Sequence, residues 1–161
     1  MTRPALIKGA RSDEWYTPLW CVKQIFDYYK PSGKILLPWD TDKSNFVRYC
    51  YNNNIEHIYN ISDFMEHDYE CDWVISNPPY SNKDAIIERC IELDKPTVLL
   101  LPIESLGGIR RHKAYRHTKL NVYIPKRRVA FISEDGKQSK AAAHHSIYLG
   151  LNFNEQIIEV E

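Results

Sequence analysis

The chain has 161 residues, of which 43% are hydrophobic and 26% are charged. This length suits one domain with a single core, and this composition excludes a disordered, collagen-like or coiled-coil protein. Basic and acidic side chains balance at 21 each, so the chain as a whole has no strong field that would attract polyanions. We therefore expect a single domain over residues 1–161, with no room for a second globular unit.

The sequence also indicates where the protein works. No run approaches the ~20 apolar residues of a membrane-spanning helix, and the first residues lack the apolar stretch of a secretory signal. The four cysteines lie far apart, without the C-x-x-C pair that is typical of zinc and redox sites. We therefore expect a cytoplasmic protein with no metal site, whose cysteines are small hydrophobic residues of the core.

Helix and strand signals alternate in the first part of the chain. Thr17 followed by a proline predicts the N-cap of a helix, and apolar residues then recur at helical spacing. A short apolar run over residues 35–37 predicts a buried strand. Ser44 is a predicted N-cap of a second helix, which is expected to end within residues 52–54. Residues 55–59 predict the next strand.

The same alternation continues with a strand over residues 72–75, which two prolines end abruptly. A helix whose apolar side covers residues 85–91 follows, with Ser81 or Asn82 as its cap. The most hydrophobic segment of the chain, residues 98–101, comes next. An uninterrupted apolar run is typical of a strand that is buried on both faces, so we expect this segment to be the central strand.

The pattern changes in the last part of the chain. A helix is expected after Glu104, then a hairpin in which residues 121–124 pair with residues 129–132, and a last strand over residues 146–151. Together these elements predict an α/β three-layer sandwich with a largely parallel sheet and antiparallel strands near the C-terminus. Sites in such sheets lie beyond the carboxyl ends of the strands.

The motif that carries chemistry follows the strand at residues 72–75 and consists of Asn77, Pro78, Pro79 and Tyr80. An asparagine oxygen and a backbone carbonyl can accept both hydrogens of an amine conjugated to a heteroaromatic ring, which makes its nitrogen more nucleophilic. Prolines have a fixed φ and no N–H, so they hold these carbonyls in place before the substrate arrives. A tyrosine ring can stack on a base turned out of a duplex. These four residues are therefore predicted to be catalytic.

The motif matches the [DNS]-P-P-[YFW] signature of amino-methyltransferases that use S-adenosylmethionine (SAM). The segment D-E-W-Y-T-P at residues 13–18 resembles the N-terminal cofactor segment of phage-type DNA N6-adenine methyltransferases. The resemblance covers residues 12 to 151. It implies a Rossmann-like methyltransferase fold, SAM as the cofactor, and methyl transfer to the exocyclic N6 amine of adenine in DNA. It also implies a bacterial host cell, with phage-encoded proteins among the relatives.

The resemblance further implies where the cofactor lies. Its methionine half is expected to lie beside Trp15, Tyr16 and Thr17. Its adenine amine is expected beside Asp63, and its adenine ring against Phe64.

The loop after the first predicted strand departs from the family pattern. A typical member has D-P-F-x-G-x-G there, whereas residues 37–44 read LPWDTDKS, without a glycine. Pro38, Asp40 and Asp42 are still expected to line the cofactor, with a carboxylate holding its amino group. Glycines allow the backbone to approach a cofactor closely and to take positive φ, so their absence bears on cofactor binding.

A basic segment interrupts this otherwise neutral chain. Residues 110–128 hold eight Lys or Arg and no Asp or Glu, which leaves 13 basic against 21 acidic side chains elsewhere. We expect this segment to lie on the same rim as Asn77 and to contact phosphates. The residues predicted to bind nucleic acid are Arg110, Arg111, Lys113, Arg116, Lys126, Arg127 and Arg128.

Three functions therefore stay open. The first is SAM-dependent methylation of adenine N6 in DNA by a monomer that has no separate target-recognition domain. The second is the same chemistry on RNA adenine or on a protein glutamine. The third is a catalytically degenerate methyltransferase fold that binds nucleic acid or protein as a phage counter-defence factor. The intact N-P-P-Y motif favours an enzyme, and the missing glycines favour the binding protein.

Overall fold

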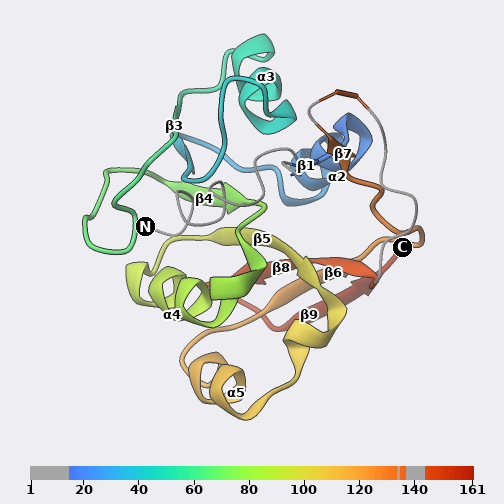
Figure 1. Cartoon of the computed structure of the whole chain (residues 1–161). Helices are drawn as coiled ribbons and strands as arrows, with labels where there is room; N and C mark the ends of the chain where they lie inside the picture. The colour runs from blue at the N-terminus through green and yellow to red at the C-terminus, as the bar shows by residue number, and fades with distance from the viewer. Residues whose placement is uncertain (1–14, 134, 137–143) are drawn as a thin grey trace.

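The computed structural model describes residues 15–133, 135–136 and 144–161. A central sheet lies between two helical layers (Figure 1). On one face pack α2 (Leu19–Tyr29) and α3 (Asn45–Asn52), and on the other α4 (Lys83–Leu93) and α5 (Ile109–Tyr115). None of the helices described here could cross a membrane. The predicted three-layer α/β sandwich is confirmed.

The main sheet has seven strands in the order β3-β2-β4-β5-β8-β6-β9. In that order they comprise His57–Tyr59, Ile35–Leu37, Trp73–Ser76, Thr97–Pro102, Ser146–Leu151, Asn121–Ile124 and Ile157–Val160. All of them run in one direction except β8, which is antiparallel to β5 and to β6. The carboxyl ends of β2, β3, β4, β5 and β6 therefore meet at one edge of the sheet, which we call the carboxyl edge; the opposite one is the amino edge.

The core divides into two layers because successive strand residues point to opposite faces. Leu37, Ile75 and Leu100 pack against α2 and α3, whereas Leu99 and Leu101 face α4. Every residue of β2, β5 and β8 is buried, as expected for strands covered on both faces. All four cysteines are free and buried, which confirms the prediction that they are core residues.

The predicted hairpin was wrong. Residues 129–132 do not pair with β6, because β8 and β9 occupy the two edges of that strand. Instead β7 (Ile132–Ser133) pairs antiparallel with β1 (Trp15–Tyr16) in a separate small sheet. The strand β9 was not expected at all. As a result, the first described strand, β1, pairs with β7 and the last strand, β9, pairs with β6, and the sequence pattern predicted neither pairing.

One helix start differs from the prediction, and another agrees with it in position but lacks the expected capping bond. The N-cap of α2 is Pro18 and not Thr17, so the helix begins one residue later than expected. Asn82 stands at the N-cap of α4 but makes no side-chain capping bond, because the short 3-10 helix η2 (Tyr80–Asn82) leads directly into α4. A second 3-10 helix, η3 (Ile103–Leu106), follows β5. Ser44 does cap α3 as predicted, since its Oγ accepts from the Phe46 N–H at 3.1 Å.

Candidate active site at the carboxyl edge

The predicted catalytic motif begins at the residue after β4. Asn77 is partly exposed, whereas Pro78 and Pro79 are buried. Pro79 is extended, with φ −66° and ψ 125°, and it caps η2. A buried pair of prolines leaves the backbone little freedom, so the carbonyls beside Asn77 keep one orientation. The motif thus presents an amide that solvent can reach on a backbone that cannot easily move.

Tyr80 is anchored through its hydroxyl end. The Oη atom is buried, and burial raises the pKa of this phenol well above its usual value. The ring meets the imidazole of His144 edge-on, with ring centroids 5.6 Å apart. The residue as a whole is only partly buried.

The segment predicted to border the methionine half of the cofactor lies near the start of α3. Asn45 Nδ2 donates to the Thr17 carbonyl at 2.9 Å, which fixes this segment beside the loop after β2. Trp15 is exposed and Tyr16 is half-buried. Asp13 and Glu14 lie outside the described residues. Asn45 was not predicted; its only signal in the sequence is its place directly after a helix cap.

The glycine-free loop after β2 is held by hydrogen bonds. Ser44 Oγ donates to Asp40 Oδ1 at 2.7 Å, and the Pro38 carbonyl accepts from the Ile61 N–H at 2.8 Å, which joins the loops after β2 and β3. Asp42 is exposed. None of residues 37–44 has a positive φ. The loop therefore adopts its path without the conformation for which glycine is favoured.

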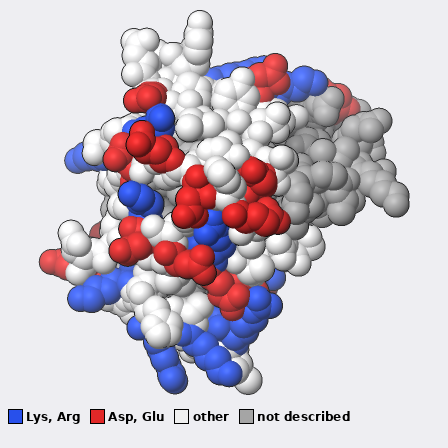
Figure 2. Space-filling view, turned by 90° about the vertical axis from the view of Figure 1, so that its left-hand side faces the viewer, with Lys and Arg blue, Asp and Glu red and all other residues white. Residues whose placement is uncertain are grey.

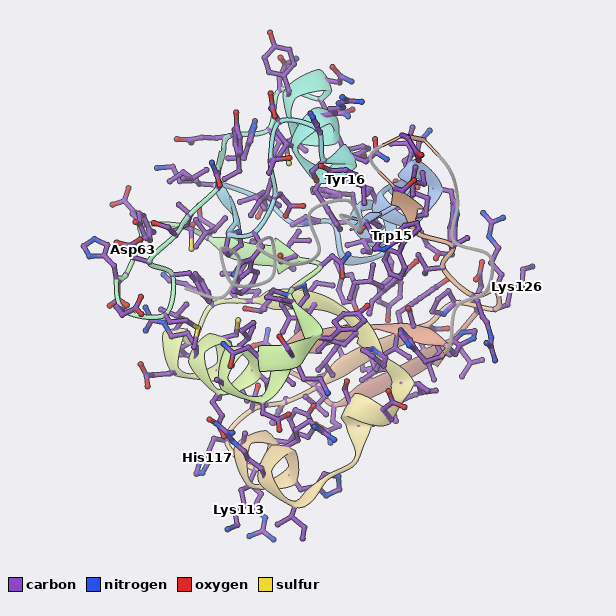
Figure 3. The ribbon with its side chains drawn as sticks, viewed as in Figure 1. Trp15, Tyr16, Asp63, Lys113, His117 and Lys126 are labelled. Atoms are coloured by element: carbon purple, nitrogen blue, oxygen red, sulfur yellow. The ribbon has the colours of Figure 1, made fainter. Side chains whose placement is uncertain are left out.

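Asp63 and Phe64, predicted to hold the adenine part of the cofactor, follow β3. Asp63 is exposed and accepts a hydrogen bond from the Tyr69 hydroxyl, which raises the pKa of that phenol. Phe64 is buried edge-on against Trp39, with centroids 5.0 Å apart and the Arg89 guanidinium 5.7 Å from its centroid. In Figure 3, Asp63 lies at the left of the molecule, apart from Trp15 and Tyr16. The contacts of both groups with a cofactor stay predictions.

Buried polar atoms without a partner collect around this edge. Most buried polar groups in proteins have a hydrogen-bond partner, so unpaired ones indicate a place for water or a ligand. Those at the carboxyl edge, with no partner among the described residues, belong to Thr17, Ser76, Tyr80, Ser105, His144 and Ser146. Hydroxyl groups, the Asp40 carboxylate and nearby aromatic rings suit a ligand that combines an amino acid with a nucleoside, so the residues present fit SAM. Sequence reasoning missed the three serines, which read as ordinary strand and turn residues.

The basic segment does not form the single cluster that was predicted. Arg110 binds both carboxylate oxygens of Glu88, at 2.8 and 2.7 Å, and this hydrogen bonding lowers the pKa of Glu88. Arg111 binds Asp84 at 2.6 Å. Both arginines thus attach α5 to α4 instead of standing free for phosphates.

The rest of the segment is split because β6 crosses the sheet within it. Lys113 and His117 lie at the α5 end of the molecule, whereas Lys126 lies near the C-terminus (Figure 3). Only Lys126, Arg127 and Arg128 return to the carboxyl edge, directly after β6. Arg127 stacks on the Trp20 ring of α2, 3.8 Å from its centroid. The expectation of one basic rim beside Asn77 was therefore wrong for the α5 residues.

Known proteins that are similar to this chain include three solved structures and one protein family. No curated protein matches the sequence. Among solved structures, a putative RNA methyltransferase, PH1948 from Pyrococcus horikoshii, is similar at a TM-score of 0.49 and 12% identity, over 91% of this chain and 88% of that one. Magnesium protoporphyrin IX methyltransferase from Synechocystis PCC 6803, with bound SAM, gives 0.45 and 11%, over 84% and 79%.

TehB from Haemophilus influenzae is similar at a TM-score of 0.45 and 12% identity. The similarity covers 83% of this chain and 62% of the TehB chain. Residues 5–156 match the DNA N-6-adenine-methyltransferase (Dam) family. This match includes the N-P-P-Y motif, the loops after β2 and β3, and the whole basic segment (residues 110–128). The chain therefore belongs to the DNA N-6-adenine-methyltransferase family, which makes it a methyltransferase with SAM as its cofactor.

Proposed function

We propose that this chain methylates the N6 amine of adenine in DNA. The observation that carries the proposal is the position of Asn77, partly exposed and followed by two buried prolines at the carboxyl end of β4. An amine conjugated to a purine ring is a weak nucleophile because its lone pair is delocalised. Two fixed carbonyl oxygens that accept its hydrogens favour the tetrahedral, reactive form of the nitrogen, and they need no rearrangement during the reaction.

In this proposal Asn77 Oδ1 is one acceptor and the adjacent backbone carbonyl is the other. Tyr80 positions the adenine ring, because its hydroxyl end is buried and its ring can turn little. No general base is required, since the methylated amine carries a positive charge and loses its proton to water afterwards.

The cofactor would lie across the loops after β2 and β3. When bound, SAM supplies a methyl group on a sulfonium centre that is open to displacement by the amine. Thr17 and Asp40 offer polar atoms to its amino-acid half, while Asp63 offers a carboxylate to its adenine amine. Asp40 is held for this role by the Ser44 hydroxyl at 2.7 Å. Lys126 and Arg128 are exposed at the same edge and suit phosphates beside the target base.

The missing glycines are the feature that favours a catalytically degenerate fold. Residues 37–44 follow their path without positive φ, which supports an enzyme, and SAM binding tests whether this loop also lets the cofactor approach closely. Methylation of RNA adenine or of protein glutamine uses the same acceptor chemistry, so the substrate must be assigned by experiment.

The test is transfer of a tritiated methyl group from SAM to unmethylated DNA, RNA and bulk protein in parallel. We expect label in DNA, at N6 of adenine after digestion to nucleosides. Label in RNA or protein with none in DNA would reject the proposed substrate, and label in none of the three would reject the proposed activity.

A further inference from the structure

The outer face of α5 was left without a role, since Arg110 and Arg111 bind to α4. Exposed on it are His112, Lys113 and Arg116, followed by His117 and Lys119. We propose that this face, which we call the α5 strip (His112, Lys113, Arg116, His117 and Lys119), binds the phosphate backbone of duplex DNA away from the target base. This inference rests on the proposed function, because it extends the contact with the same substrate.

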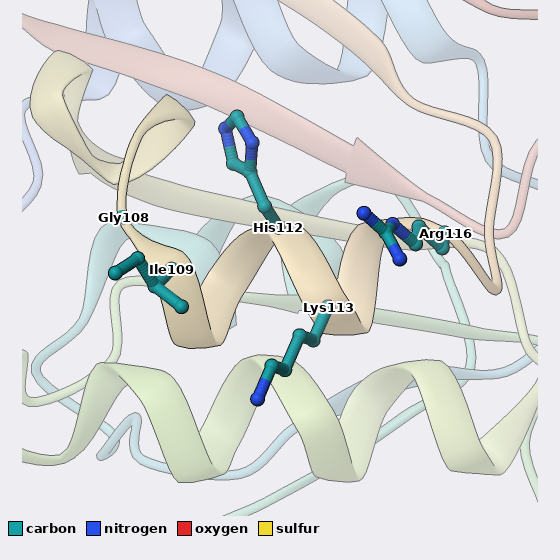
Figure 4. A pocket seen from close by; sticks show the side chains of 5 residues that line it. All are labelled: Gly108, Ile109, His112, Lys113 and Arg116. Carbon is teal, nitrogen blue, oxygen red and sulfur yellow. The ribbon is translucent and has the colours of Figure 1, made fainter.

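Two hollows lie along the strip. The first, of about 430 Å³, is lined by Gly108, Ile109, His112, Lys113 and Arg116 (Figure 4). The second, of about 510 Å³, is lined by Asp94, Arg116, His117, Thr118, Lys119, Asn152, Phe153 and Asn154. Arg116 lines both, so the two hollows are neighbours. A single small anion would need only one of them, whereas a polynucleotide chain can occupy both.

The charge of the strip matches such a partner. Residues 110–128 contain no acidic side chain, and Asp94 is the one acid among the described residues that line the two hollows. Two carboxylates of α4, Asp84 and Glu88, are already bound to Arg111 and Arg110. Figure 2 shows Lys and Arg side chains gathered at the lower end of the molecule, where α5 lies, below a band of acidic side chains. The neutral net charge of the chain therefore conceals a basic end.

The length and direction of the strip also suit a nucleic acid backbone. From Gly108 the helix runs beside α4 to the amino edge, where Thr118 Oγ1 donates to Asn152 Oδ1 at 3.1 Å. Seven helical residues span about 10 Å. One DNA strand has a phosphate every ~3.4 Å along the duplex axis, so this length corresponds to about three phosphates. Lys113 lies within this helix, and Arg116 and Lys119 continue the positive charge beyond its C-terminal end.

The experiment compares the wild type with K113Q/R116Q/K119Q. A matched control, K23Q/K30Q/R48Q, removes the same charge from exposed residues of α2, its C-cap and α3. Binding to a 24-base-pair unmethylated DNA duplex and to an RNA duplex of the same sequence is measured by fluorescence anisotropy from 50 to 300 mM NaCl. Thermal unfolding of each variant shows that its fold is intact.

We expect the strip variant to bind DNA at least about tenfold more weakly at 100 mM salt. The slope of log K against log salt should fall in magnitude by about 3, because three phosphate contacts are lost. The control should stay within about twofold of the wild type. The strip variant should also raise KM for the DNA duplex in the methyl-transfer assay.

Equal slopes for the strip variant and the wild type would overturn the inference. If the wild type still methylates DNA in that case, the proposed function stands without it. A loss of affinity confined to the RNA duplex would reject DNA as the partner of the strip. Absence of DNA methylation by the wild type would instead reject the proposed function, and the inference with it.

Discussion

The two edges of the sheet treat their polar groups in opposite ways. At the amino edge, Asn152 Nδ2 donates to the carbonyls of Cys90 at 3.0 Å and Lys95 at 2.8 Å, while its Oδ1 accepts from Thr118. At the carboxyl edge, the buried hydroxyls of Ser76 and Ser105 have no partner among the described residues. At the amino edge the Asn152 amide forms hydrogen bonds within the fold, whereas at the carboxyl edge the Ser76 and Ser105 hydroxyls are left for water or a ligand.

This difference has an energetic meaning. A buried polar group without a partner costs about 1–3 kcal/mol, and a fold tolerates several only where water or a ligand satisfies them. The carboxyl edge is therefore less stable than it could be and ready to bind, whereas the amino edge stabilises the sheet. Changes at the carboxyl edge should mainly alter activity, and changes at Asn152 should mainly alter stability.

The largest effect is expected for Asn77→Ala. Loss of one fixed acceptor should lower methyl transfer about 100- to 1000-fold, by analogy with the removal of one oxyanion-hole donor. Because Asn77 is only partly buried, the free energy of unfolding should change by less than about 1 kcal/mol. Tritium transfer and urea unfolding measure the two effects, with Asn52→Ala, at the exposed end of α3, as the control. Substantial activity in Asn77→Ala would remove this residue from the reaction.

The amino edge should show the reverse behaviour with Asn152→Ala. This change removes the amide that donates to the Cys90 and Lys95 carbonyls, of which Lys95 still accepts from the Thr97 hydroxyl, and it places alanine at a φ of 64°. We expect a loss of about 3 kcal/mol in the free energy of unfolding, from the lost bonds together with left-handed strain. Asn152→Gly lacks that strain and should lose about 1 kcal/mol less. Equal stability of Asn152→Ala and the wild type would contradict the comparison of the two edges.

The sequence predicted the elements that depend on local signals. Helical spacing, the Ser44 cap and continuous apolar runs located α2, α3 and β5, and residues 121–124 and 146–151 were assigned as strands with their observed bounds. The position of Asn77 at a strand end followed from the two prolines. Such features depend on residues close in the chain, so their pattern is visible in it.

Long-range features could not be predicted in the same way. The pairing of β1 with β7 joins strands of two residues each, which is too short for any periodicity. The capture of Arg110 and Arg111 by α4 depends on how two helices pack, so a run of like charges in the sequence became two separate surfaces in space. The unpaired hydroxyls of Ser76 and Ser146 become visible only when the strands lie side by side.

Cofactor binding should test the carboxyl edge directly, because SAM is expected to satisfy the polar groups that are left there without partners among the described residues. A ligand that binds only the folded chain stabilises it by about 2.7 kcal/mol at 100 times its Kd. SAM should therefore raise Tm, while Asp40→Asn should need more SAM for the same shift, because a carboxylate toward the cofactor is lost. Differential scanning fluorimetry over a SAM titration measures this, with exposed Asp27→Asn as the control. A wild-type Tm that does not change with SAM would show that the carboxyl edge does not hold this cofactor.

The smallest effect is expected for Ser44→Ala, a residue that belongs to both sides of the comparison. Ser44 lies at the carboxyl edge, yet its hydroxyl is fully used, because it accepts from Phe46 N–H and donates to Asp40. Loss of the cap should cost about 1 kcal/mol, or about 2–4 °C in Tm. Since Asp40 also loses the hydroxyl that donates to it, SAM affinity should fall together with stability. The control Ser32→Ala, at an exposed residue, should change neither SAM affinity nor stability. If Ser44→Ala lowered Tm but left SAM affinity intact, Asp40 would need no support from the cap, and the backbone hydrogen bonds of the loop, such as Ile61 N–H to the Pro38 carbonyl, would be enough to order it.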